Sequence, residues 1–351
     1  MHMSDALISV AVGGAMLAVT AGIAAHSVKK IQSDMDEKKI PLMGVMGAFV
    51  FAAQMINFTI PVTGSSGHIG GGMLLAILLG PYAGFLTMAS ILLIQALFFG
   101  DGGLLAYGCN VFNMGFFTCF IAYPLIYKWS TSKVMNSKRI FGASLFSVVI
   151  GLQMGAFSVV LQTLLSGKTE LPFGTFILLM QPIHLVIGVV EGLITAAVVA
   201  FVWKARPEIL ENAANGQGLS NIPLKKVLGS LLFAAIIIGG TLSWFASANP
   251  DGLEWSIEKT AGTRELEAPT GIHKLISEIQ SKTTFLPDYD FKTKVGENIK
   301  APSDQIVEAA TSVNAGTSVS GIIGGALTLG LAVLTGLAIH VVKRKNKKVN
   351  T

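Results

Sequence analysis

The first two residues, Met1 and His2, are the pair best suited to binding a metal ion. The terminal amine, the backbone amide nitrogen of His2 and its imidazole can close two fused chelate rings around one small cation. Three nitrogens in one plane suit Ni(II) or Cu(II), which favour square-planar or tetragonal nitrogen sites. Taken alone, the dipeptide is more simply an ordinary chain start, so its meaning depends on what lies beside it.

A second histidine, His68, lies in a glycine-rich stretch, Pro61–Gly72. The stretch lacks the Gly-Lys-Ser/Thr ending of a phosphate-binding P-loop. Irregular backbone at membrane depth is tolerated only where it is buried in protein or lines a cavity. A lone histidine there is most simply a hydrogen-bonded structural ring. On the same outer face as His2, however, His68 can fill the fourth position of a planar site through either ring nitrogen.

Hydrophobic residues make up 52% and charged residues 13% of the 351 residues. A soluble domain cannot bury that much apolar surface, so the composition indicates a polytopic protein of the lipid bilayer. The formal net charge of +5 does not indicate a nucleic-acid partner, because the basic residues lie in short loops where they set topology. Cys109 and Cys119 lie about 15 Å apart along one predicted helix and cannot form a disulfide within it.

Nine apolar runs predict nine transmembrane helices and an all-α, polytopic helical bundle. Seven of them form the core, and two C-terminal helices flank a small extracytoplasmic segment. The first run, Ala6–Ala25, is longer than the apolar core of a secretory signal, so we expect it to be retained. The runs cover residues 6–25, 41–59, 70–80, 82–99, 107–127, 140–165, 176–203, 227–248 and 318–342.

Positive charge predicts the orientation, because cytoplasmic loops carry an excess of Lys and Arg. The basic clusters share one side only if residues 61–101 cross an even number of times, which predicts two short helices meeting at Gly80-Pro81. The N-terminus is then outside and the C-terminus inside a bacterial or archaeal plasma membrane, so Met1 and His2 face outward. The clusters lie at residues 29–39, 128–139, 204–226 and 343–348.

Composition also indicates how the chain divides. We expect residues 1–205 to form a transmembrane domain with the candidate metal site, and 206–226 to form a cytoplasmic linker. Residues 227–351 would form a second, two-helix domain. This domain contains the extracytoplasmic segment 249–317, which holds 11 acidic and 7 basic residues.

Polar side chains inside the predicted spans are further candidates, because intramembrane carboxylates are rare and face a cavity or a partner. Glu191 and His184 lie on one face of a predicted helix. They form either a relay that supports the metal site or, as we prefer, a network that fixes helix packing. Amide side chains can orient metal ligands, but they also commonly join helices. The amide candidates are Asn57, Gln95, Asn110, Asn113 and Gln153.

Several motifs, in order, resemble the substrate-binding membrane subunit of bacterial energy-coupling-factor (ECF) cobalt and nickel transporters, the CbiM/NikM family. These motifs are Met1–Ser9, Gly64–His68, Leu79–Gly84 and Asn110–Met114. The stretch Asn249–Ser256 is similar to the Pro-Asp-Gly-Leu-Glu (PDGLE) motif of the small CbiN/NikN-like auxiliary subunit, so the two subunits look fused. In residues 265–315 we recognise no motif of that subunit.

The resemblance implies a seven-helix bundle that inserts its N-terminus into the core. It implies metal binding by the Met1 amine, the His2 amide and ring, and His68. The chain would be the substrate-specificity component of an ATP-driven importer for Ni(II) or Co(II), in a family linked to cobalamin biosynthesis. A membrane coupling (T-type) subunit and cytosolic ATPase subunits would be its partners. The metal would be cargo, and no cofactor is expected.

We expect no enzyme, because the sequence has no nucleophile–base constellation and no Walker A motif. Nickel is slightly preferred over cobalt, since it favours a planar set of four nitrogens. A proton-coupled secondary transporter using Glu191 and His184 is an alternative, although the two halves show no inverted repeat. A membrane metal sensor without transport is another. By analogy with the auxiliary subunit, segment 249–317 would load the metal or gate its access.

Overall fold

Long apolar runs form helices here because a backbone in lipid must satisfy its N–H and C=O groups internally. The computed structural model describes residues 1–34, 37–132, 134–219, 222–264, 266, 271–292 and 315–349. Within these residues, six helical stretches are long and apolar enough to cross a membrane, and the predicted all-α bundle is confirmed. They are α1 (Val10–Asp34), α4 (Pro81–Ile94) with a π-helical extension to Phe99, α5 (Tyr107–Val111) with a π-helical extension to Lys128 and α6 (Trp129–Thr131), α7 (Ser137–Leu165), α8 (Phe173–Ala205) and α13 (Ala315–Val349).

Three shorter apolar helices complete the bundle: α2 (Lys39–Gln54), α3 (Gly72–Leu79) and α10 (Lys225–Gly240). As predicted, two helices meet at Gly80-Pro81, where Gly80 has a φ of 82° and permits a tight turn. The first of the two helices is shorter than a full crossing. Its 8 residues rise only about 12 Å, against a hydrocarbon core of about 30 Å. The buried glycine-rich loop precedes α3 in place of further helical turns.

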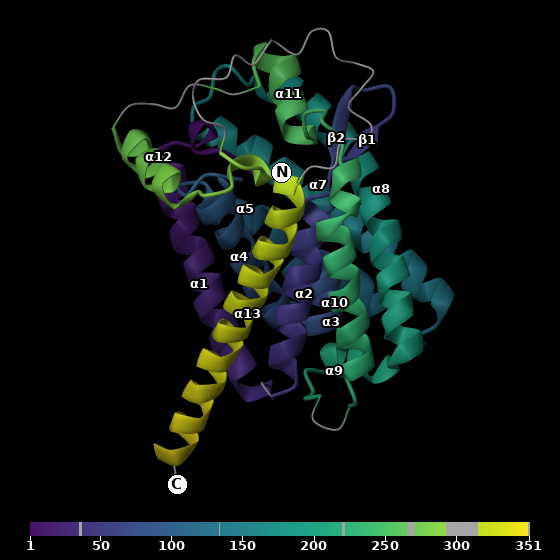
Figure 1. Ribbon diagram of the computed structural model, residues 1–351. Helices are drawn as coiled ribbons and strands as arrows, with labels where there is room; N and C mark the ends of the chain where they lie inside the picture. The colour runs from purple at the N-terminus through teal and green to yellow at the C-terminus, as the bar shows by residue number, and fades with distance from the viewer. Residues whose placement is uncertain are drawn as a thin grey trace.

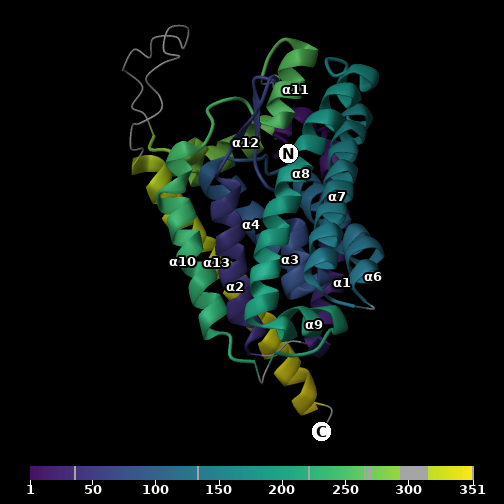
Figure 2. The same ribbon diagram turned by 90° about the vertical axis from the view of Figure 1, so that its right-hand side faces the viewer.

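The two C-terminal helices, α10 and α13, pack on α2, so the second half of the chain is joined to the core by helix contacts (Figures 1 and 2). The two helices also touch each other at backbone distance. A Cβ atom at Gly321 would lie 2.3 Å from the carbonyl oxygen of Gly239. A side chain there would push the helices apart, which explains why small residues occupy this crossing.

One end of the bundle carries a short β-hairpin and two helices. The strands β1 (Phe58–Ile60) and β2 (Ser65–Gly67) are antiparallel, and α11 (Gly252–Ala261) and α12 (Ile272–Thr283) lie at the same end (Figure 1). We call this the hairpin end. The opposite end carries α9 (Pro207–Asn215) and the C-terminus (Figures 1 and 2). Short 3-10 turns cover Asp5–Leu7, Leu242–Phe245 and Pro287–Tyr289.

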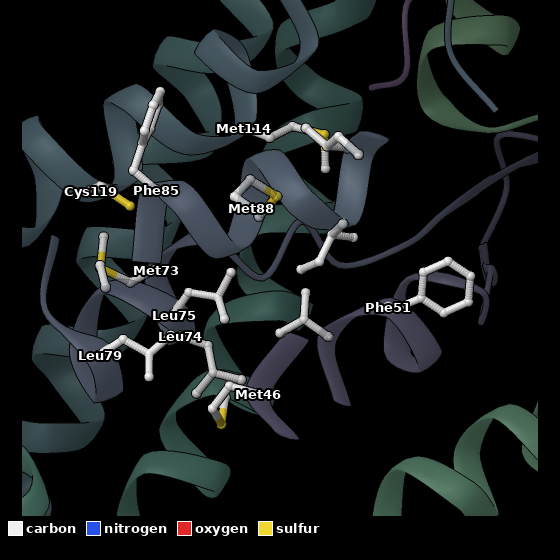
Figure 3. Close-up of a cluster of buried hydrophobic side chains, with 14 of the residues drawn as sticks. Met46, Phe51, Met73, Leu74, Leu75, Leu79, Phe85, Met88, Met114 and Cys119 are labelled. Carbon is white, nitrogen blue, oxygen red and sulfur yellow. The ribbon is translucent and has the colours of Figure 1, made fainter. Parts of the chain in front are cut away.

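Methionine and large aliphatic side chains fill the core of the bundle (Figure 3). Met46, Met73 and Met88 are fully buried, and they come from α2, α3 and α4 in turn. Flexible thioethers of this kind fill the irregular gaps between helices. Outward positions of α7 and α8 expose large apolar side chains such as Phe146 and Leu178, as expected of surfaces that face lipid.

Candidate metal centre

The N-terminal segment runs into the bundle, where Met1 is 6% and Met3 0% exposed. The side chain of Asn110 clamps Met3. Its Oδ1 accepts a hydrogen bond from the Met3 amide at 2.8 Å, and its Nδ2 donates to the Met3 carbonyl at 3.1 Å. The Gly103 amide donates to the same carbonyl at 2.9 Å. These bonds fix the terminal amine and His2 in place ahead of α1.

His2 and His68 meet although they are far apart in sequence. Their rings stack, with centroids 5.1 Å apart and planes inclined by 22°. The terminal amine of Met1 and the Nε2 of His68 face one carboxylate oxygen, Asp251 Oδ2, at 3.4 Å and 3.8 Å. A cavity of about 10 Å³ opens between them, which is room for one small ion or water molecule. The three residues predicted as ligands therefore lie side by side.

A directional chain of hydrogen bonds decides which nitrogen of His2 carries the proton. The chain starts at the carbonyl of Gly70, which can only accept, so Gln54 Nε2 donates to it at 2.7 Å. Gln54 Oε1 then accepts from Gln95 Nε2 at 2.9 Å. Gln95 Oε1 is left to face His2 Nε2 at 3.1 Å, so this nitrogen is the donor. His2 Nδ1 keeps its lone pair.

A carboxyl group lies beside that lone pair. Asp101 Oδ1 is 3.3 Å from His2 Nδ1, and the hydroxyl of Tyr289 donates to Asp101 Oδ2 at 2.5 Å. Burial raises the pKa of Asp101, which favours a proton between the carboxyl and the imidazole. Tyr289 is itself held by stacking on Phe99, with centroids 4.9 Å apart. The second half of the chain thus reaches His2 through a tyrosine that sequence analysis did not single out.

The tautomer of His68 is also set by a backbone carbonyl. Its Nδ1 donates to the carbonyl of Ile69 at 3.0 Å, so the lone pair is on Nε2, the nitrogen nearest the amine and Asp251. Burial, reinforced by the positive terminal amine, lowers the pKa of His2 to about 3 and that of His68 to about 4. Both imidazoles are therefore neutral at neutral pH. Each has one ring nitrogen that carries no proton of its own: Nδ1 of His2, which faces Asp101, and Nε2 of His68, which faces Asp251.

Asp251 is the functional candidate that sequence analysis missed, although it lies inside the recognised PDGLE motif. It caps α11: its Oδ1 accepts from the amides of Leu253 and Glu254, both at 2.8 Å, and this leaves Oδ2 facing the amine. Burial acts to raise the pKa of Asp251, but the amine and His68 outweigh it and hold that pKa well below its usual range. The group is a carboxylate.

The segment around Asp251 is bonded directly to the hairpin that precedes His68. The amide of Ser66 donates to the carbonyl of Pro250 at 2.8 Å, and the Ser66 hydroxyl donates to that of Asn249 at 2.8 Å. The indole of Trp255 donates to the carbonyl of Thr63 at 2.9 Å. The PDGLE motif and the histidine loop therefore form one continuous cover over the cavity.

Glu191 holds the glycine-rich loop. Its carboxyl oxygens accept from the amides of Gly70 and Gly71 at 2.7 Å and 2.8 Å. His184 lines the cavity with Met1 and His68, and its Nδ1 donates to the carbonyl of Met180 at 2.8 Å. None of the described contacts joins Glu191 to His184. The arrangement favours the packing interpretation over a proton relay between the two.

The predicted amide residues divide into two groups. Gln95 and Asn110 lie at the site, as described, and Asn113 Nδ2 reaches the sulfur of Met3 at 3.5 Å. Gln153 instead joins helices, since its Nε2 donates to the carbonyl of Gln181 at 2.9 Å. Asn57 accepts a bond from the Ser247 amide through its backbone, and none of its described contacts reaches the site.

The chain is similar to known metal-transport proteins. A family model described as the cobalt uptake substrate-specific transmembrane region matches residues 2–209, more than half of the chain. The chain belongs to this family. By the description of this family, the chain is a membrane component of transition-metal uptake. A second model, the PDGLE domain, matches residues 225–341, which include Asp251.

Individual relatives have the same fused organisation. The chain is 34% identical over 219 residues to a protein named putative fused nickel transport protein NikMN from Archaeoglobus fulgidus, covering 61% of this chain and 69% of that one. It is 32% identical over 216 residues to a probable fused nickel transport protein LarMN from Lactiplantibacillus plantarum, covering 59% and 66%. A crystal structure of a truncated transition metal transporter matches with a TM-score of 0.52 and 32% identity, over 58% of this chain and 99% of that one.

Proposed function

We propose that this family member is the substrate-specificity component of an ATP-driven ECF importer, binding Ni(II) or Co(II) at its N-terminus and passing the metal inward. The proposal is carried by the neighbouring positions of these groups: the His2 and His68 rings stack, and Met1 and His68 line one small buried cavity. The described residues hold no group of three or more His, Cys, Asp or Glu side chains suited to a metal. A metal bound here would therefore draw on backbone nitrogen.

Four nitrogens would surround the cation. The amine, the deprotonated amide of His2 and His2 Nδ1 form the two fused chelate rings, and His68 Nε2 takes the remaining position. The hydrogen-bond chains support this choice, because they leave the lone pairs on these two ring nitrogens. A planar set of four nitrogens favours Ni(II), so we prefer nickel slightly over cobalt.

Asp251 supplies a negative charge that balances the site both without metal and with metal bound. Without metal it pairs with the ammonium group of Met1. When the divalent cation binds, the amine and the amide must each lose a proton. The cation and the amide anion then leave one net positive charge, which Asp251 again balances. Neither state contains an unpaired buried charge, which would be costly.

The same proposal gives a role to each part of the chain. Residues 1–205 bind the metal, 206–226 link the halves on the cytoplasmic side, and 227–351 form the auxiliary domain whose PDGLE motif closes the site. The N-terminus is outside and the C-terminus inside a bacterial or archaeal plasma membrane. A T-type coupling subunit and cytosolic ATPases supply the energy. A proton-coupled transporter has less support, because Glu191 is engaged by two backbone amides.

The first test is metal bound per purified chain, measured for Ni(II) and Co(II). Two residues added before Met1 should abolish stoichiometric binding, because the amine moves away and the chelate rings no longer close. Two residues added after Thr351 provide the matched control, and intact mass confirms both termini. Equal binding by the N-terminally extended chain would rule out the amine as a ligand.

The transport part needs a separate measurement. Vesicles containing this chain with its coupling and ATPase subunits should accumulate metal only with ATP. Accumulation by the chain alone, driven by a proton gradient, would replace the ECF assignment with secondary transport. Binding without accumulation under every condition would indicate a sensor.

A further inference from the structure

Basic side chains surround an apolar groove that lies far from the candidate metal centre. The groove has a volume of about 420 Å³ and opens where the start of α2, the α8–α9 junction and the start of α10 converge. α9 marks this end of the bundle, opposite the hairpin end (Figures 1 and 2). Its lining includes the cations Lys38, Arg206, Lys225 and Lys226 and the buried apolar residues Ile222 and Leu224.

Specific contacts build this groove. The Lys38 ammonium donates to the carbonyl of Ile222 at 2.9 Å, which ties the start of α2 to the segment before α10. Arg206 interrupts the helix between α8 and α9, with φ −155° and ψ 83°, and so projects from a fixed bend. The groove is therefore defined by the fold of the linker as well as by its composition.

Positive charge is concentrated here. α10 begins with Lys225 and Lys226 and has no acidic residue in its first turn. The N-terminus of a helix is itself positive, so lysines are unfavourable there and an anion is favoured. Among the described ion pairs, none involves Arg206, Lys225 or Lys226. Basic residues that set membrane topology are expected on this side. Topology alone, however, does not explain why they surround an apolar groove.

The apolar floor favours a lipid over an acidic protein segment as the occupant. Beyond the groove, α10 continues with exposed apolar side chains, Phe233 at 65% and Ile236 at 50%. A phosphate held by cations beside an exposed apolar helix face matches the amphipathic structure of a phospholipid. Basic pockets between transmembrane helices are known to hold anionic headgroups.

We propose that this groove binds one anionic phospholipid, with the phosphate among the four cations and the acyl chains along α10. The lipid would brace the linker that joins the metal-binding and auxiliary halves. This inference does not depend on the proposed metal chemistry.

The test uses the full-length chain in neutral detergent, with phosphatidylglycerol and phosphatidylcholine as probes and native mass spectrometry to count bound lipid. We expect phosphatidylglycerol to bind preferentially and the double variant Lys225→Gln/Lys226→Gln to weaken it roughly thirtyfold, the effect of removing two basic contacts. Lys29→Gln/Lys138→Gln removes the same charge outside the groove and should retain the preference. Lys225→Arg/Lys226→Arg keeps the charge and should also retain it.

Three results would overturn the proposal. The first is equal binding of the two lipids by the unmodified chain. The second is an equal loss in the control pair, which would reduce the effect to general charge. The third is a groove variant that keeps its phosphatidylglycerol but no longer assembles with the coupling and ATPase subunits, because the groove would then be a protein-docking surface.

Discussion

Two neighbouring backbone carbonyls determine the proton positions on both histidines of the candidate site. The carbonyl of Ile69 accepts from His68 Nδ1 directly, and the carbonyl of Gly70 acts on His2 through two glutamines. Because a carbonyl never donates, each chain has one direction only. The glycine-rich loop therefore contributes more than His68 to the candidate metal centre, since its backbone also sets which nitrogen of His2 carries the proton.

This directionality predicts a role for Gln54, which touches no proposed ligand. In Gln54→Leu the side-chain amide of Gln95 loses the acceptor that fixes its orientation. Either its oxygen or its nitrogen can then face His2. We expect metal affinity to fall by about tenfold to a hundredfold, as is usual when the partner of a metal-binding histidine is removed. Gln153→Leu, which disrupts a bond between helices instead, should bind normally. Equal loss in both variants would mean that general packing, and not the proton position, is responsible.

Among the elements, α11 combines a structural and a chemical role at one residue. Asp251 starts the helix with a capping box, in which the Asp251 amide donates back to the carboxylate of Glu254 at 3.1 Å. The second oxygen of the same carboxylate faces the terminal amine. The start of α11 is thereby tied to the candidate metal centre, so any movement of α11 shifts a carboxylate relative to the amine.

Asp251→Asn separates the two roles, because Asn caps a helix as well as Asp does. We expect α11 to remain folded and metal affinity to fall by at least about tenfold, since the cation would be left with an uncompensated buried charge. Helicity by circular dichroism and metal binding by calorimetry measure the two effects. Glu258→Gln removes a charge from the same helix away from the site and is the control. Unchanged affinity in Asp251→Asn would contradict its role as counter-charge.

Sequence patterns predicted the helices well and the contacts of the loops poorly. The apolar runs identified the helical bundle, and charge placement identified the turn at Gly80. The terminal dipeptide and the glycine-rich loop identified His2 and His68. Gln54, Asp251 and Tyr289 could not be found in this way, because their roles depend on contacts across long stretches of sequence. A polar residue in a span has the same local pattern whether it orients a ligand, like Gln95, or joins helices, like Gln153.

The whole molecule is organised so that the second half covers the first. α10 and α13 pack on α2. At the hairpin end, the PDGLE segment reaches the terminal amine through Asp251, and Tyr289 bonds Asp101 beside His2. His273 adds a further tie, since its Nε2 donates to the carbonyl of Ile8 at 2.8 Å. The N-terminal segment is therefore held by groups from both halves, and its stability belongs to the folded chain as a whole.

This burial makes the metal-free protein sensitive to acid. The pKa values of His2 and His68 are lowered to about 3 and about 4 in the fold, from 6.5 in an exposed histidine. As the pH falls below 6.5, these two histidines bind protons in the unfolded chain but stay neutral in the folded chain. Their contribution to the free energy of unfolding therefore decreases down to about pH 4. Thermal unfolding in detergent between pH 7 and pH 4 measures this slope. His68→Gln should reduce it, whereas His26→Gln, at an exposed position of α1, should leave it unchanged. A slope that is the same in all three proteins would show that the buried imidazoles do not control acid stability.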